Sequence, residues 1–192
     1  MASTMMHLYV GKRFKDKHGK IKDTEQFYLG CVYPDCVNAF GFASAEVRWP
    51  AHLRTKDINE WYENNRLFYR SNTGDINEDF LLGHVIHNIT DAAYDEHFNK
   101  MIDRKDWQRF AQEQGTKDWW TEDVLPVLRN VLLRTDILEI NGVSEAYVKT
   151  HLEWILSEGR LESSDEEPIC LTTNVMDKLS EIVHELIADF IK

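Results

Sequence analysis

The 192-residue chain is 43% hydrophobic and 29% charged, which allows a packed core and argues against global disorder. Its 9 glycines and 4 prolines are too few for a loop-rich all-β fold with many tight turns. The net charge of -11 argues against binding to nucleic acid or to an anionic membrane. It still allows a phosphate substrate, because a bound divalent cation reverses the local field.

Cysteine usage and the N-terminal sequence bear on the compartment. Cys31, Cys36 and Cys170 lack the regular spacing of a disulfide framework. Residues 1–13 show no basic segment followed by an apolar one, as a secretion signal would. No apolar run approaches the roughly 18 residues that a transmembrane helix needs. We therefore expect a cytoplasmic protein without a transmembrane segment; the sequence carries no signal for its oligomeric state.

The N-terminal segments are mixed in character. Residues 5–14 form a short mixed segment around His7, and residues 15–23 form a lysine-rich stretch that we expect to be a charged loop. The apolar segment that follows predicts a helix to about Val32. It should end before Pro34, because a residue that precedes proline disfavours the helical conformation.

The clearest helix is predicted at residues 77–98, with its core at about 79–93. Apolar residues occur almost all round it, which is typical of a central helix. Before it, residues 54–68 are polar but carry aromatic side chains at positions that suit a helix. Asn72 and Gly74 then indicate a turn.

The C-terminal half predicts further helices. Thr121 is a suitable cap for a helix at 123–134, and Ser144 for one that reaches about Ser157. The turn signal Asn141-Gly142 lies between the two.

The end of the chain combines a linker with a helix. Residues 159–168 are acidic and serine-rich, and residues 173–191 have apolar side chains at spacings of 3 and 4. We expect an all-α, multi-helix bundle around the helix at 79–93. Residues 1–158 would form a helical metallohydrolase-like domain. Residues 159–192 would add a linker and an amphipathic helix that packs on the same domain.

Three ionisable residues of the central helix indicate a metal site. His84, His87 and Asp91 occupy positions i, i+3 and i+7, so they lie on one face of that helix. Imidazole nitrogen and carboxylate oxygen are good ligands for zinc. Taken alone, the pattern is more typical of hydrogen-bonded core residues, since buried polar groups need partners.

Four features of the sequence, taken in order, favour the metal site over ordinary core residues, because together they resemble one family. They are Phe27-Tyr28-Leu29-Gly30 through Pro34-Asp35, Ala51-His52-Leu53-Arg54, the Gly-x-x-x-His-x-x-x-Asp pattern that ends at Asp91, and the spacing from Asp91 to His97. Together they resemble the zinc-dependent phospholipase C superfamily, which also includes fungal-type zinc nucleases. The likeness covers about residues 5–98, and the helix at 79–93 is its most specific part.

The resemblance implies a role for each matching residue. The proposed ligands of a first zinc ion are Asp35, His52, His87 and Asp91. Asp91 would bridge to a second ion that His7 also binds. His97 matches a ligand of a third metal position. Asp35 would also act as general base, and His84 would orient a ligand by donating a hydrogen bond to a carboxylate.

Two departures from the family pattern reduce the expected number of metal ions. The family's cluster uses the amino terminus of a processed chain, whereas His7 follows six residues here. The family also has a His-x-x-x-Glu pair soon after the position of His97, and residues 98–125 contain no histidine. We therefore expect one or two ions, zinc or another divalent metal.

The sequence leaves three functions open. The leading hypothesis is a metal-dependent phosphoesterase acting on a small phosphoester or a lipid headgroup through metal-activated water. A helical phosphohydrolase with a His-Asp doublet ranks below it, because no such dipeptide occurs. The alternative is a non-catalytic, helical metal-binding or interaction protein with a partly degenerate site. An exposed apolar stripe on the helix at 173–191 would favour that alternative.

Overall fold

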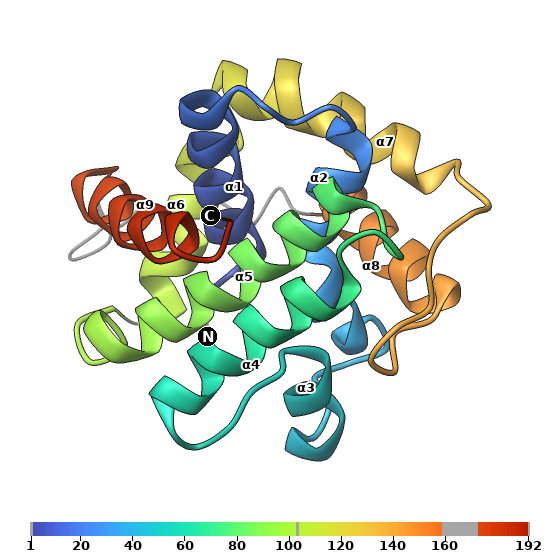
Figure 1. The fold of residues 1–192 in the computed structure, drawn as a ribbon. Helices are drawn as coiled ribbons and strands as arrows, with labels where there is room; N and C mark the ends of the chain where they lie inside the picture. The colour runs from blue at the N-terminus through green and yellow to red at the C-terminus, as the bar shows by residue number, and fades with distance from the viewer. Residues whose placement is uncertain (1, 103, 159–172, 192) are drawn as a thin grey trace.

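The structure is a computed structural model that describes residues 2–102, 104–158 and 173–191. Within those ranges it is built from helices, and only two isolated bridges, each closing a turn, have strand character. The expected all-α fold is confirmed (Figure 1). The elements in chain order are α1 (Thr4–His18), α2 (Thr24–Val32), the 3-10 helix η1 (Tyr33–Asn38), α3 (Ala45–Ala51), α4 (Ile58–Asn72), α5 (Glu78–His97), α6 (Arg104–Gln114), the π-helix η2 (Trp119–Val124), α7 (Leu125–Leu132), α8 (Glu145–Glu158) and α9 (Thr173–Ala188).

The central element is α5, as the sequence predicts. It contacts α1, α2, α4, α9 and η1, and it crosses the middle of the bundle in Figure 1. Nearly every side chain between Phe80 and Tyr94 is buried. The Asn77 side chain caps the helix by accepting hydrogen bonds from the backbone N–H groups of Asp79 and Phe80.

Two glycines allow α2 and α5 to pack backbone against backbone. A Cβ atom at Gly30 would lie 2.7 Å from the backbone nitrogen of His84 and closer still to the carbonyl oxygen of Phe80. A Cβ atom at Gly83 would collide with the carbonyl oxygen of Phe27. Only glycine fits at such a crossing, so these two residues set the separation of the helices.

The N-terminal segment differs from the sequence prediction. The mixed segment and half of the expected charged loop form one continuous helix, α1, which ends only at Gly19 with a positive φ of 59°. The lysines did not exclude a helix, because Lys17 is exposed and Lys15 is only partly buried, while Val10 and Phe14 of the same helix are buried.

The start of α7 also differs. The prediction that Thr121 caps a helix at 123–134 is wrong: Thr121 lies inside η2, and its hydroxyl donates to the Lys117 carbonyl oxygen at 3.3 Å. The α-helix begins at Leu125, since Pro126 in its first turn loses no hydrogen bond there. The predicted turn at Asn141-Gly142 is confirmed, with positive φ angles of 52° and 80°.

The last helix, α9, packs against α1 and α5. Its apolar stripe, Met176, Leu179, Val183 and Ile187, is buried, so this stripe is not an open docking surface. The predicted acidic linker at 159–168 lies outside the described residues. Among the described helices, none combines the length and apolar character needed to cross a membrane.

Candidate metal centre

Five side chains from four parts of the chain meet beside α5. His7 comes from α1, Asp35 from η1, and His52 from the residue that follows α3, while His87 and Asp91 lie one turn apart on α5. The three histidines and Asp91 are fully buried, and Asp35 is 8% exposed. Residues separated by up to 84 positions in the sequence are thus brought into one buried cluster.

The imidazole nitrogens face the two carboxylates at close range. The His7 Nε2 atom lies 3.3 Å from Asp91 Oδ1 and 3.9 Å from Asp35 Oδ2. The His52 Nε2 atom lies 3.5 Å from Asp35 Oδ1 and 3.6 Å from Asp91 Oδ2. The His87 Nε2 atom lies 3.9 Å from Asp91 Oδ2. Most of these separations exceed an ordinary hydrogen bond, so the nitrogens approach the carboxylates without pairing tightly with them.

Backbone carbonyls fix the protonation of two rings. His52 Nδ1 lies 2.8 Å from the Arg48 carbonyl oxygen, and His87 Nδ1 lies 2.8 Å from the Cys31 carbonyl oxygen. A carbonyl oxygen only accepts, so each Nδ1 carries the hydrogen. In the neutral ring the Nε2 atom then has a free lone pair, which is the arrangement that zinc-binding histidines adopt.

Several buried polar atoms of the cluster have no hydrogen-bond partner. They are both ring nitrogens of His7, the Nε2 atoms of His52 and His87, and Asp91 Oδ2. Burying such atoms unpaired is expensive, and a cation would satisfy all the acceptors among them. Two sets of ligand atoms lie within 4.8 Å of one another and could hold an ion: His7, His87 and Asp91, and Asp35, His52 and His87. The donor set fits zinc.

The carboxylates and rings perturb one another's protonation. Burial opposes ionisation of Asp35, but contact with His52 and the nearby His87 and His7 rings hold its pKa well below the usual value. Burial likewise opposes ionisation of Asp91, and the adjacent His7 lowers its pKa overall. Burial holds the pKa of His87 well below its ordinary value. The cluster therefore retains two ionised carboxylates and a neutral His87, the forms that bind a cation.

Hydrogen bonds from neighbouring elements hold the ligands in place. The Ala2 backbone N–H donates to Asp91 Oδ1 at 2.5 Å. The Trp61 indole donates to the His52 carbonyl oxygen at 2.8 Å, and Asn65 donates to the Trp61 carbonyl oxygen at 2.9 Å. Asn88 donates to Asn65 at 2.9 Å, which joins α5 to α4. The sequence analysis did not predict this series of contacts. Its one sign in the sequence is Asn88, a polar residue directly after His87 in a largely apolar helix.

His84 and His97 lie outside the cluster. His84 is buried between Phe68 and Asn88, with its Nδ1 atom 3.4 Å from Asn88 Nδ2. Among the residues that the structure describes, no carboxylate contacts His84. The side chain of His97 is 43% exposed and lies 3.5 Å from Glu96. The structure thus brings together five of the seven residues that the sequence singled out.

One further histidine lies near the cluster. His151, on α8, is 5% exposed, and its Nε2 atom has no hydrogen-bond partner. Burial lowers the pKa of His151, and the Asp35 charge opposes this shift. The helix α8 packs against η1, which carries Asp35. The sequence predicts only packing or surface exposure for this residue, because nothing in its helical pattern relates it to Asp35.

Comparisons of the chain with protein-family models, with curated proteins and with solved structures found no match.

Proposed function

We propose that this chain is a metal-dependent phosphoesterase whose metal centre is formed by His7, Asp35, His52, His87 and Asp91. The observation that carries the proposal is the set of unpaired, buried ring nitrogens directed at two ionised carboxylates. Buried His84 and His151 also have an unpaired Nε2 atom, but among the described residues only the cluster directs three such atoms at the same two carboxylates, which is the arrangement of a metal site.

The two overlapping ligand sets support one or two zinc ions. His87 belongs to both sets, and Asp91 lies near the Nε2 atoms of all three histidines. A bound divalent ion would lower the pKa of a coordinated water to about 7 and offset phosphoryl charge in the transition state.

Asp35 is the residue that faces the substrate. Its side chain is 12% exposed, whereas those of the other four residues are at most 1% exposed. Because its pKa is held low, Asp35 stays ionised and can accept a hydrogen bond from an attacking water. We therefore propose that Asp35 both binds the metal and orients that water, while the four buried residues hold the ion.

Direct metal analysis tests the centre. Protein expressed with supplementary zinc and dialysed should retain about one to two zinc ions per chain by elemental analysis. The H87A and D91A variants should lose them, while H184A, a change at a partly exposed histidine of α9, should not. H97A should also keep them, because that side chain lies outside the cluster. Metal-free wild-type protein would refute the proposal.

Activity on a panel of phosphomonoesters and phosphodiesters, with zinc and other divalent metals, tests the chemistry. The D35N variant should lose most of the activity.

The alternative is a structural metal site in a non-catalytic protein. One observation favours it: four of the five residues are fully buried, which is typical of closed structural sites. Stoichiometric zinc with no activity across the panel would support this alternative and reject the phosphoesterase.

A further inference from the structure

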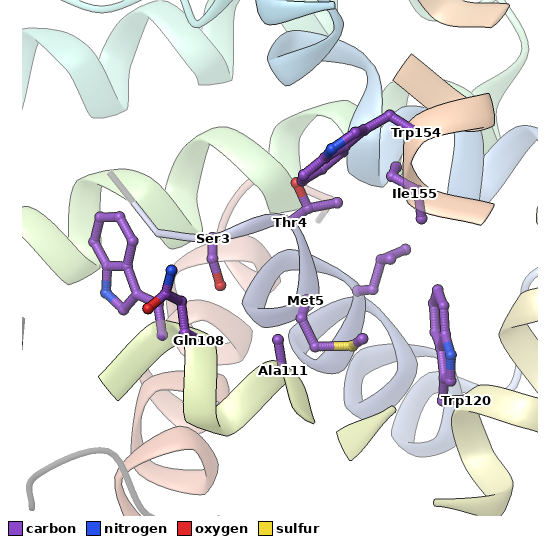
Figure 2. A pocket seen from close by; sticks show the side chains of 10 residues that line it. Ser3, Thr4, Met5, Gln108, Ala111, Trp120, Trp154 and Ile155 are labelled. Atoms are coloured by element: carbon purple, nitrogen blue, oxygen red, sulfur yellow. The ribbon is translucent and has the colours of Figure 1, made fainter. Parts of the chain in front are cut away.

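An apolar pocket of about 200 Å³ lies between the start of α1, α6, η2 and α8. Its walls include three tryptophans, Trp107, Trp120 and Trp154. In Figure 2, Gln108 and Ala111 lie on one side of Met5, and Trp120 and Trp154 lie on the other. Within the described ranges, no charged side chain lines it. Such a lining suits an uncharged apolar group and disfavours an ionic one.

Two helices link the pocket to the candidate metal centre. On α1, Thr4 lines the pocket and His7, at i+3, belongs to the cluster. On α8, Trp154 lines the pocket, and α8 packs against η1, the element that carries Asp35. Residues three apart are neighbours on a helix surface, and one turn spans about 5.4 Å. The pocket therefore begins about one helical turn from His7, and its lining residue Ser3 follows Ala2, whose backbone N–H donates to Asp91.

The pocket also offers a polar contact for a ligand. The Ser3 hydroxyl lines it and is buried without a hydrogen-bond partner. His151 stacks on Trp154, with ring centroids 5.6 Å apart, and its Nε2 atom is likewise unpaired. Two unpaired polar groups thus border the apolar walls, and both are available to hydrogen-bond an oxygen of a substrate ester.

We propose that this pocket binds an uncharged apolar ester group, alkyl or aryl, of a phosphoester whose phosphoryl group lies at the metal centre. The proposal rests on the proposed function. The pocket is built from residues after position 98 together with the start of α1, so it selects substrates independently of the metal ligands.

The test is calorimetric titration of zinc-loaded protein with phosphonates, which are not hydrolysed. Hexylphosphonate should bind at least about tenfold more tightly than methylphosphonate, because two or more methylene groups become buried. Phenylphosphonate should also bind more tightly than methylphosphonate, because its ring becomes buried between the tryptophans. A chain of equal length that ends in a carboxylate should show no such gain.

Two variants test whether the hexyl group of the ligand binds in this pocket. W154A removes a wall that is 47% exposed, and A111L fills the pocket. Both should abolish most of the advantage of hexylphosphonate and leave methylphosphonate binding unchanged. L133A, at a leucine that is 80% exposed and remote from the pocket lining, should change neither.

The outcomes separate this inference from the proposed function. Equal binding of the methyl and hexyl ligands to wild-type protein would overturn the pocket assignment and leave the phosphoesterase standing. A hexyl advantage that survives in both W154A and A111L would also overturn it. If no phosphonate binds the zinc-loaded protein, the proposed function fails and this inference fails with it.

Discussion

The crossing of α2 and α5 makes a strong prediction for Gly83→Ala. A Cβ atom at this position would collide with the Phe27 carbonyl oxygen and would lie 2.9 Å from the Cys31 nitrogen and 3.1 Å from Gly30 Cα. All three neighbours are backbone atoms, so no side chain can rotate away and the helices must separate.

The size of the effect follows from two opposing terms. Overpacking lowers the free energy of unfolding by about 1–3 kcal/mol, and we expect a clash between backbones to cost about 3 kcal/mol or more. The higher helix propensity of alanine offsets about 1 kcal/mol. We expect a net loss of roughly 2 kcal/mol in the free energy of unfolding, measured by urea denaturation of the metal-free protein.

The same separation should weaken the metal centre. Moving α2 from α5 stretches the 2.8 Å contact between His87 Nδ1 and the Cys31 carbonyl oxygen, which fixes the His87 ring. Loss of such a supporting contact lowers metal affinity by about 10–100-fold. Zinc competition with a chelating dye measures this.

The control is Gly115→Ala, after α6, where the nearest atoms are two carbonyl oxygens of its own helix at 3.0 and 3.5 Å. It should leave zinc affinity unchanged. Wild-type stability and zinc affinity in Gly83→Ala would refute the reasoning.

Three further predictions concern buried polar groups and the metal. Tyr33→Phe should lose about 1–3 kcal/mol of stability, because the Tyr33 hydroxyl contacts the Leu138 and Val143 carbonyl oxygens at 2.6 and 2.9 Å. The control Tyr28→Phe should lose little, because the buried Tyr28 hydroxyl has no partner. Equal losses of the two variants in urea denaturation would contradict this prediction. Burial lowers the pKa of His84 to about 3, so between about pH 6.5 and pH 3 only the unfolded chain protonates this side chain. As the pH falls from 6 to 4, the free energy of unfolding of metal-free wild-type protein should therefore decrease by up to about 1.4 kcal/mol per pH unit because of His84. In urea titrations, His84→Gln should show a shallower pH dependence. Removal of zinc by a chelator should lower the melting temperature of wild-type protein at pH 7, with a smaller effect in D91A, and equal shifts in calorimetry would argue against the site.

The sequence determined the fold class and the central helix. The apolar residues around 79–93 identify a buried helix, because such a pattern leaves no face for water. The turn at Gly142 follows from a local backbone restriction, which acts whatever the rest of the chain does. The expected end of α2 at Val32 is confirmed, but not for the expected reason: Tyr33, before Pro34, keeps helical angles and the chain continues as η1. Local rules failed where tertiary packing determines the secondary structure. The lysines at the end of α1 predict a loop but lie in a helix, and Thr121 predicts a helix cap but lies inside a π-helix.

For the candidate metal centre too, the sequence determines some features and the tertiary structure the others. The sequence alone places His87 and Asp91 one turn apart, because helix geometry fixes that spacing, and the resemblance adds His7, Asp35 and His52. Only the tertiary structure decides which atoms meet: it leaves His97 outside the cluster and directs the Nδ1 atoms of His52 and His87 to carbonyl oxygens. It also packs α8, with the buried His151, against η1, which carries Asp35. Contacts between distant segments depend on how closely helices pack, and here the glycines at the α2–α5 crossing set that distance.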